Sequence, residues 1–199
     1  CHLVCNAVAG GDAGEPHYVT VLSDVTQQKR AEQELLYLAN FDTLTNLPNR
    51  AMLSERLSRA IVRARRHEGR IGLLFLDLDR FKEINDSLGH AGGDRILRAA
   101  AKRLQQTVGE QHTVARLGGD EFMVVLEDLG SPDQAEHAAR EIIMAFEAPL
   151  HIDGRQEIAT SPSIGISLYP EHGQVPTELI KRADTAMYQA KAAGRRTFM

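Results

Sequence analysis

The chain has 199 residues, 43% of them hydrophobic, which is enough to bury one core and carry a short additional segment. A formal net charge of −4, 5% aromatic residues and the lack of Trp argue against nucleic acid as a partner. Apolar runs are too short to span a bilayer, residues 1–15 lack a signal-peptide pattern, and the only cysteines, Cys1 and Cys5, are interpreted as reduced thiols. These features predict a cytoplasmic location and leave open a membrane anchor in the full-length protein.

Two elements are predicted near the start of the chain. Residues 17–25 are rich in Val and Thr, which predicts a strand. Residues 27–40 predict a helix, because Ala31, Leu35 and Leu38 follow one another at intervals of four and three. One stripe of this length is too short to establish a coiled coil. Because the sequence starts without Met, we interpret it as a piece of a longer protein.

The next segments alternate between turn-rich, helical and apolar patterns. Residues 42–49 are turn-rich, and residues 50–66 predict a basic amphipathic helix whose arginines we interpret as a solvated face rather than a membrane contact. The nearly continuous apolar run 71–76 predicts a central strand that is buried on both faces. A helix is expected from about Arg80, and another over residues 93–108.

Hairpins and helices follow in the second half of the chain. Strands at 113–117 and 121–126 flank Gly118-Gly119, which predicts a tight hairpin. The remaining expected elements are a helix at 132–146, a hairpin around Asp153-Gly154, a strand at 164–168 and a helix at 177–192. Strands mixed with helices and joined partly by hairpins predict an α+β fold, with a mainly antiparallel central sheet flanked by helices.

Acidic residues gather at the ends of two predicted strands. Asp77 ends the buried strand, and Asp79 would point to the same side if the strand continues that far. Asp120 and Glu121 lie at the hairpin tip. If the hairpin pairs beside the buried strand, Asp77, Asp120 and Glu121 meet, and their repulsion would need a cation. Oxygen ligands with positions left for phosphate favour Mg²⁺. The alternative is a plain turn whose acidic residues serve solubility.

Basic and amide side chains near these strand ends are candidates for nucleotide binding. Lys82 lies at the mouth of the buried strand, whereas Lys191 and Arg195 lie near the end of the last helix. The alternative is a solvated helix residue for Lys82 and cations favoured at a helix C-terminus for the other two. None of the three is specific by itself.

Asn85 and Asp94 flank the glycine-rich stretch 89–93. A carboxylate accepts two N–H bonds from the guanine edge, and an amide can serve the adjoining acceptors, so this pair would select guanine over adenine. Alternatively, Asn85 is a surface residue and Asp94 an acidic residue in the first turn of a helix. His90 is either a ligand residue or a structural hydrogen-bonding residue.

Several segments resemble, in order, the motifs of GGDEF-domain diguanylate cyclases. They are DTLTNLPNR (42–50), FLDLDRFKEINDSLGHAGGD (75–94), ARLGGDEF (115–122), SIGIS (163–167) and ADTAMYQAKAAGR (183–195). The resemblance implies a GGDEF domain over 41–199, with a fold related to polymerase palm domains and nucleotidyl cyclases. Residues 17–36 resemble the last strand and exit helix of a PAS sensor domain. We therefore expect a PAS-like remnant at 1–26 and a helical linker at 27–40.

The resemblance also implies site residues. Mg²⁺ would bind the Asp77 and Asp120 carboxylates and the Leu78 carbonyl. Asn85 and Asp94 would hold the guanine of GTP. The other implied contacts are Lys82, Lys191 and Arg195 to phosphates, backbone N–H groups near Phe81 to phosphates, Leu44 and His90 near the substrate, and Arg116 as a brace for the hairpin.

The implied reaction makes the bacterial second messenger cyclic di-GMP. The 3′-hydroxyl of one GTP attacks the α-phosphorus of another, and pyrophosphate leaves. Asp120 or Glu121 would take the proton, and Lys82 would stabilise the charge that develops in the transition state. Because each domain would hold one GTP and the product needs two, a homodimer is expected to be the active unit.

Two further expectations concern regulation. Many relatives carry an Arg-x-x-Asp motif for product inhibition, whereas the matching positions here are Gly109 and His112, so this site is expected to be absent. The segment FLDLDRFKEINDSLGH also resembles GGDEF domains found in tandem with phosphodiesterases. The alternative function is therefore a GTP-binding module that controls a C-terminal phosphodiesterase domain. A related adenylyl or guanylyl cyclase fits the motifs less well.

Overall fold

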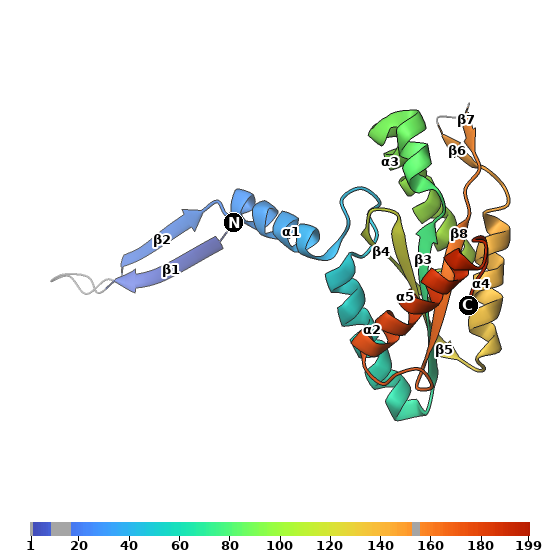
Figure 1. Ribbon diagram of the computed structural model, residues 1–199. Coiled ribbons are helices and arrows are strands. Elements are labelled where there is room, and N and C mark those ends of the chain that lie inside the picture. Colours follow the sequence, from blue (N-terminus) through green and yellow to red (C-terminus); the bar gives the residue numbers. More distant parts are fainter. Residues whose placement is uncertain (1, 9–16, 153–155) are drawn as a thin grey trace. The chain divides into compact units, whose positions relative to one another are not determined.

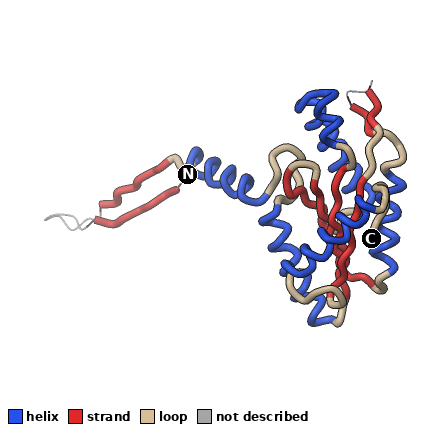
Figure 2. The backbone as a smooth tube through the Cα atoms, viewed as in Figure 1, coloured by secondary structure: helices blue, strands red, loops and turns tan. Residues whose placement is uncertain are grey.

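A computed structural model describes residues 2–8, 17–152 and 156–199 (Figures 1 and 2). Contacts divide the chain into two units, Cys1–Ala39 and Asn40–Met199, which are described separately. Cys1 and the predicted turn at Asp153-Gly154 lie outside the described residues.

The first unit contains an antiparallel strand pair and a helix. Strand β1 (His2–Val8) pairs with β2 (His17–Ser23), and α1 (Thr26–Asn40) follows. The predicted strand and helix are confirmed, whereas β1 was not predicted, because its sequence HLVCNAV lacks a clean alternation of polar and apolar residues. Across the described part of the chain, no helix combines the length and apolarity needed to cross a membrane.

The second unit is built on a four-stranded antiparallel sheet in the order β4-β5-β3-β8. The strands are β3 (Arg70–Leu78), β4 (Thr113–Gly118), β5 (Glu121–Leu129) and β8 (Pro162–Tyr169). Strand β3 lies between β5 and β8, and eight of its nine residues are buried. The predicted central strand and the predicted α+β fold are therefore confirmed.

Helices cover both faces of this sheet (Figure 1). The flanking helices are α2 (Arg50–His67), α3 (Phe81–Val108), α4 (Asp133–Ala145) and α5 (Pro176–Ala192). The odd-numbered residues of β3 from Ile71 to Phe75 pack in one apolar cluster with α2 and α5, whereas the even-numbered residues from Leu74 to Leu78 pack with α3 and α4. Alternation along a strand therefore assigns Asp77 to the face that α5 covers.

The helix boundaries follow local sequence signals. Asn49 caps α2, because its side-chain oxygen accepts hydrogen bonds from the N–H groups of Ala51 and Met52 at 2.9 and 3.1 Å. The predicted apolar stripe of α2, which includes Leu53 and Leu57, is buried. A short second sheet, β6 (Leu150–Ile152) with β7 (Gln156–Ile158), follows α4.

Element α3 contains the two predicted helices, which meet at a kink, although the second begins before the predicted Gly93. The element spans Phe81–Val108, and Gly89 inside it has the non-helical angles φ 70° and ψ 168°, which kink the element. Glycine adopts this positive φ without the steric cost that a side chain would bring. The element therefore has two arms, residues 81–88 and 90–108, that meet at the kink.

Gly165 in β8 allows the closest contact between the sheet and α5. A Cβ atom at this position would lie 2.0 Å from the Ala183 carbonyl oxygen and 2.1 Å from the Met187 backbone nitrogen. Because backbone atoms cannot swing aside as the end of a side chain can, a substitution here would push α5 away from the sheet.

We predict that Gly165→Ala lowers the free energy of unfolding by about 3 kcal/mol or more, because overpacking against backbone cannot relax locally. Urea denaturation of the 199-residue chain measures the effect. Gly69→Ala is the control, since its added Cβ would make an ordinary contact at 3.6 Å with Ala64. A loss at Gly165 no larger than at Gly69 would contradict this account of the packing.

Candidate active site

The β4–β5 hairpin pairs beside β3 and brings acidic residues to one end of the sheet. In this pairing Asp77 lies opposite Glu121, and the Leu78 N–H donates to the Asp120 carbonyl oxygen at 3.2 Å. The hairpin tip contains Gly118 and Gly119, which have φ values of 140° and 53°. The predicted hairpin therefore does pair beside the buried strand, as the expected approach of the three carboxylates required.

Arg116 braces the hairpin tip against the turn that precedes α2. Its Nε and Nη2 donate to the Gly119 carbonyl oxygen at 3.0 and 2.7 Å, and its Nη1 donates to both carboxylate oxygens of Asp42 at 3.0 and 2.9 Å. Its backbone N–H donates to the Pro48 carbonyl oxygen at 3.0 Å. Such charge-assisted bonds from a planar guanidinium fix both distance and direction.

The charge of Asp42 depends on this brace. Burial by itself would raise the pKa of the Asp42 carboxyl, but hydrogen bonds from Thr45 and Arg116 together with the Arg116 charge hold the pKa below its usual value. Thr45 contributes both its N–H, at 2.9 Å, and its hydroxyl, at 2.6 Å. Asp42 was not among the predicted site residues.

Asp77 lies buried among like charges, with one cation in contact. Its Oδ2 lies 2.6 Å from Nζ of Lys191, on the face that α5 covers. Burial raises the pKa of the Asp77 carboxyl, the neighbouring Asp120 and Asp79 raise it further, and Lys191 opposes them. A cation bound beside Asp77 would favour its ionised form, because the cation would offset the acidic neighbours.

The donor set at this point suits a hard divalent cation. Asp77 and Asp120 offer carboxylate oxygens and Leu78 a carbonyl oxygen, and oxygen ligands are those that Mg²⁺ prefers. Among the residues that the structure describes, no three His, Cys, Asp or Glu side chains are already gathered as a metal-binding group.

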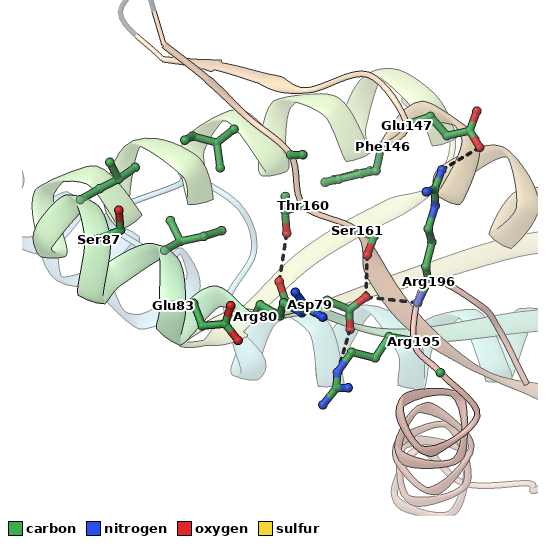
Figure 3. Close-up of a pocket in the computed structure, with 15 residues that line it drawn as sticks. Asp79, Arg80, Glu83, Ser87, Phe146, Glu147, Thr160, Ser161, Arg195 and Arg196 are labelled. Atoms are coloured by element: carbon green, nitrogen blue, oxygen red, sulfur yellow. Dashed lines mark hydrogen bonds and ion pairs between the residues drawn. The ribbon is translucent and has the colours of Figure 1, made fainter.

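Asp79 lies just beyond the end of β3 at Leu78, and its carboxylate is engaged by other partners, although its charge still acts on Asp77. The carboxylate accepts hydrogen bonds from the hydroxyls of Ser161 and Ser163, both at 2.7 Å, and from the Arg196 N–H at 3.2 Å. Figure 3 shows Asp79 between these segments, with the Arg195 side chain beside it at 3.9 Å. Asp79 therefore anchors the start of β8 and the C-terminal segment to the end of β3.

A cavity of about 530 Å³ opens beside this anchor (Figure 3). Of the predicted site residues, Arg195 is among those that line it, whereas Asn85, Asp94 and Asp77 are not. The cavity therefore does not coincide with the predicted guanine site.

The kink in α3 distributes the predicted nucleotide residues over its two arms. The first arm carries Phe81, which is buried, Lys82, which is exposed, and Asn85, which is half-buried. The second arm carries Asp94, half-buried, and His90, exposed. The fold thus brings Asn85 and Asp94 to the same bend of one helix.

Leu44 lies close to the same helix. Its side chain packs against the core cluster on the α3 face, and its carbonyl oxygen accepts a hydrogen bond from Nε of Arg98 at 3.2 Å. The turn that contains Leu44 is also the turn that Arg116 holds through Asp42. One short segment therefore touches both the hairpin and α3.

The positions that match the inhibitory motif have structural contacts of their own. Gly109 ends α3 with φ 81°, and Nδ1 of the half-buried His112 accepts a hydrogen bond from the Glu127 N–H at 3.3 Å. Burial lowers the pKa of His112, and Glu127 and Asp128 partly oppose the shift. The expected absence of a product-binding site stays a prediction.

Comparison with known proteins identifies relatives of this arrangement. Residues 39–197 match the family described as "Diguanylate cyclase, GGDEF domain". Diguanylate cyclase TpbB of Pseudomonas aeruginosa is 47% identical over 171 residues, which cover 84% of this chain and 39% of TpbB. MucR of the same species, a bifunctional diguanylate cyclase/cyclic di-GMP phosphodiesterase, is 46% identical over 170 residues, which cover 85% of this chain and 24% of MucR.

The crystal structure of the TpbB GGDEF domain matches with a TM-score of 0.75 and 48% identity, covering 77% of this chain and 95% of that one. The family match, residues 39–197, lies almost entirely in the second unit. The chain spans well under half the length of either curated relative.

We predict that Asp42→Asn lowers the free energy of unfolding at pH 7 by about 1.5–3 kcal/mol, the usual contribution of a hydrogen bond to a charged partner. Since the folded pKa of Asp42 is depressed, its stabilisation is present above the unfolded pKa of about 3.9 and is lost as the pH falls through the folded value. Urea denaturation between pH 7 and pH 3 measures the difference, with exposed Asp133→Asn as the control. A deficit that stays constant down to pH 3 would exclude the charge as its source.

Proposed function

Because the chain belongs to the GGDEF family, we propose that residues 41–199 form a diguanylate cyclase domain, which condenses two GTP molecules into cyclic di-GMP and releases pyrophosphate. The observation that carries the proposal is the pairing of β3 with β5, which sets Asp77 beside the Asp120-Glu121 tip. Lys191 of α5 contacts Asp77 there. Residues 1–26 would be a PAS-like remnant and residues 27–40 a helical linker.

We assign the Mg²⁺ site to the carboxylates of Asp77 and Asp120 and the carbonyl of Leu78. When bound, Mg²⁺ would increase the acidity of the attacking 3′-hydroxyl and offset the negative charge of the phosphates. The buried position of Asp77 among Asp120 and Asp79 supports the assignment, because a cation would relieve the repulsion that raises its pKa.

The residues around this site would hold the triphosphate. Lys191 already lies against Asp77, so a phosphate bound at the same place would be within reach of its ammonium group. Exposed Lys82 and the first N–H groups of α3, near Phe81, offer further donors, as helix N-termini commonly do for phosphates. Arg195 would complete the set from the segment after α5.

In this proposal, different residues accept the proton and bind the guanine. Asp120 or Glu121, at the hairpin tip that Arg116 braces, would accept the proton from the attacking hydroxyl. Asn85 and Asp94 would bind the guanine at the bend of α3. The reaction would then depend on two elements, the hairpin and the kinked helix, being held at a fixed distance from each other.

The alternative is a GTP-binding regulatory module acting on a phosphodiesterase domain; MucR, a bifunctional diguanylate cyclase/cyclic di-GMP phosphodiesterase, combines the two activities in one protein. The complete Gly118-Gly119-Asp120-Glu121-Phe122 motif favours catalysis over sensing. Incubation with GTP and Mg²⁺, followed by chromatographic separation of the nucleotides, distinguishes the two, because a sensor would bind GTP and leave it unchanged.

We predict that Asp77→Ala and Asp120→Ala each abolish formation of cyclic di-GMP while the melting temperature changes little, because each removes an oxygen ligand from the Mg²⁺ site. Asp133→Ala, which removes an exposed carboxylate from α4, serves as the matched control and should keep full activity. Near-normal turnover in either site variant would refute the metal assignment.

We also predict that the 199-residue chain is mostly monomeric and that its specific activity rises with protein concentration, because the product requires two domains that face each other. Initial rates over a hundredfold dilution series, with sedimentation at the same concentrations, measure this. A specific activity that is constant across the series would argue against a transient dimer.

A further inference from the structure

The two arms of α3 approach each other through glycine. Gly93 on the second arm is buried, and a Cβ atom built on it would lie 1.9 Å from Oδ1 and 3.0 Å from Cγ of Asn85 on the first arm. The next contact is the ring of Phe81, at 3.1 Å. The Asn85 amide therefore occupies the space that any side chain at position 93 would fill.

We infer that Gly93 is a positioning residue that sets guanine selectivity, because its missing side chain determines where the Asn85 amide lies beside Asp94. The inference rests on the proposed function, since it takes Asn85 and Asp94 as the guanine-binding pair. Asp94 directly follows Gly93 in the chain, so this one position borders both members of the pair.

The geometry explains why a single methyl group would matter. A contact of 1.9 Å would force the Asn85 amide to move by about 1 Å, and hydrogen bonds tolerate N···O distances of only about 2.7–3.2 Å. The clashing atom is the end of a side chain, which can rotate away, so the arms can keep their packing while the amide leaves its place. The effect of a substitution should therefore fall on base recognition more than on the fold.

The alternative is that Gly93 only lets the two arms pack. A double-mutant cycle separates the two roles, because Asn85→Ala removes the atoms with which a Cβ at position 93 would collide. If Gly93 acts through Asn85, Gly93→Ala should have little further effect on nucleotide binding in the Asn85→Ala background. If it acts through packing of the arms, its effect is the same in both backgrounds.

The experiment is calorimetric titration of the 199-residue chain and its variants with non-hydrolysable analogues of GTP and ATP in the presence of Mg²⁺. We expect Gly93→Ala to weaken binding of the GTP analogue about tenfold, and the preference over the ATP analogue to fall by a similar factor, as when a hydrogen bond is lost. In the Asn85→Ala background, Gly93→Ala should weaken binding of the GTP analogue less than twofold. Gly69→Ala, a glycine substitution remote from α3, should change neither value.

Two outcomes overturn the inference: Gly93→Ala keeps the full preference for the GTP analogue, or its effect is equally large in the Asn85→Ala background. Should Gly93→Ala alone fail to fold, adding Asn85→Ala must restore the melting transition, and failure to restore it would also overturn the inference.

Asp94→Ala separates this inference from the proposed function. If Asp94→Ala and Asn85→Ala lose the base preference and Gly93→Ala keeps it, only the role of Gly93 is wrong. If the unsubstituted chain itself does not prefer the GTP analogue, the proposed function fails as well.

Discussion

The antiparallel pairing of β3 with β5 is the constraint on which the rest of the site depends. Strand β3 is buried on both faces by two layers of helices, so its register cannot slip by one residue without moving apolar side chains to the wrong layer. That register sets Asp77 opposite Glu121 and the Leu78 N–H against the Asp120 carbonyl oxygen. The core thus determines where Asp77 and the hairpin tip lie, although none of its apolar side chains is assigned a part in the chemistry.

The position of Asp77 within this frame sets its electrostatics. Alternation along β3 directs it to the face that α5 covers, and Lys191 near the end of α5 contacts it there. Burial and the neighbouring acidic residues oppose the ionised form of Asp77, and one lysine offsets them in part. A divalent cation bound beside these carboxylates would offset their mutual repulsion, since it carries the opposite charge.

Prediction from sequence succeeded where the signal was local and stopped where it depended on distant partners. The apolar run of β3 predicted a strand and its burial, and the glycine pair predicted the hairpin, because strand periodicity and turn chemistry act over a few residues. The ion pair between Arg116 and Asp42 joins residues 74 positions apart, and no rule of sequence spacing predicts it. Asp79 shows the same limit, because its partners Ser161 and Ser163 come from β8 and the turn before it.

The sheet and the kinked helix contribute differently to the candidate site. The sheet end is held by ladder hydrogen bonds and by Arg116, whose contacts reach both the hairpin tip and the turn before α2, so the backbone that carries Asp77, Asp120 and Glu121 is firmly held. The two arms of α3 are instead related by the dihedral angles of one glycine, and their close approach depends on the space that Gly93 leaves. Guanine binding would therefore depend on the backbone angles of Gly89 and on the space beside Gly93, two residues without a functional side chain. Such positions are invisible to any search for chemically active residues, and only the packing between the two arms reveals them.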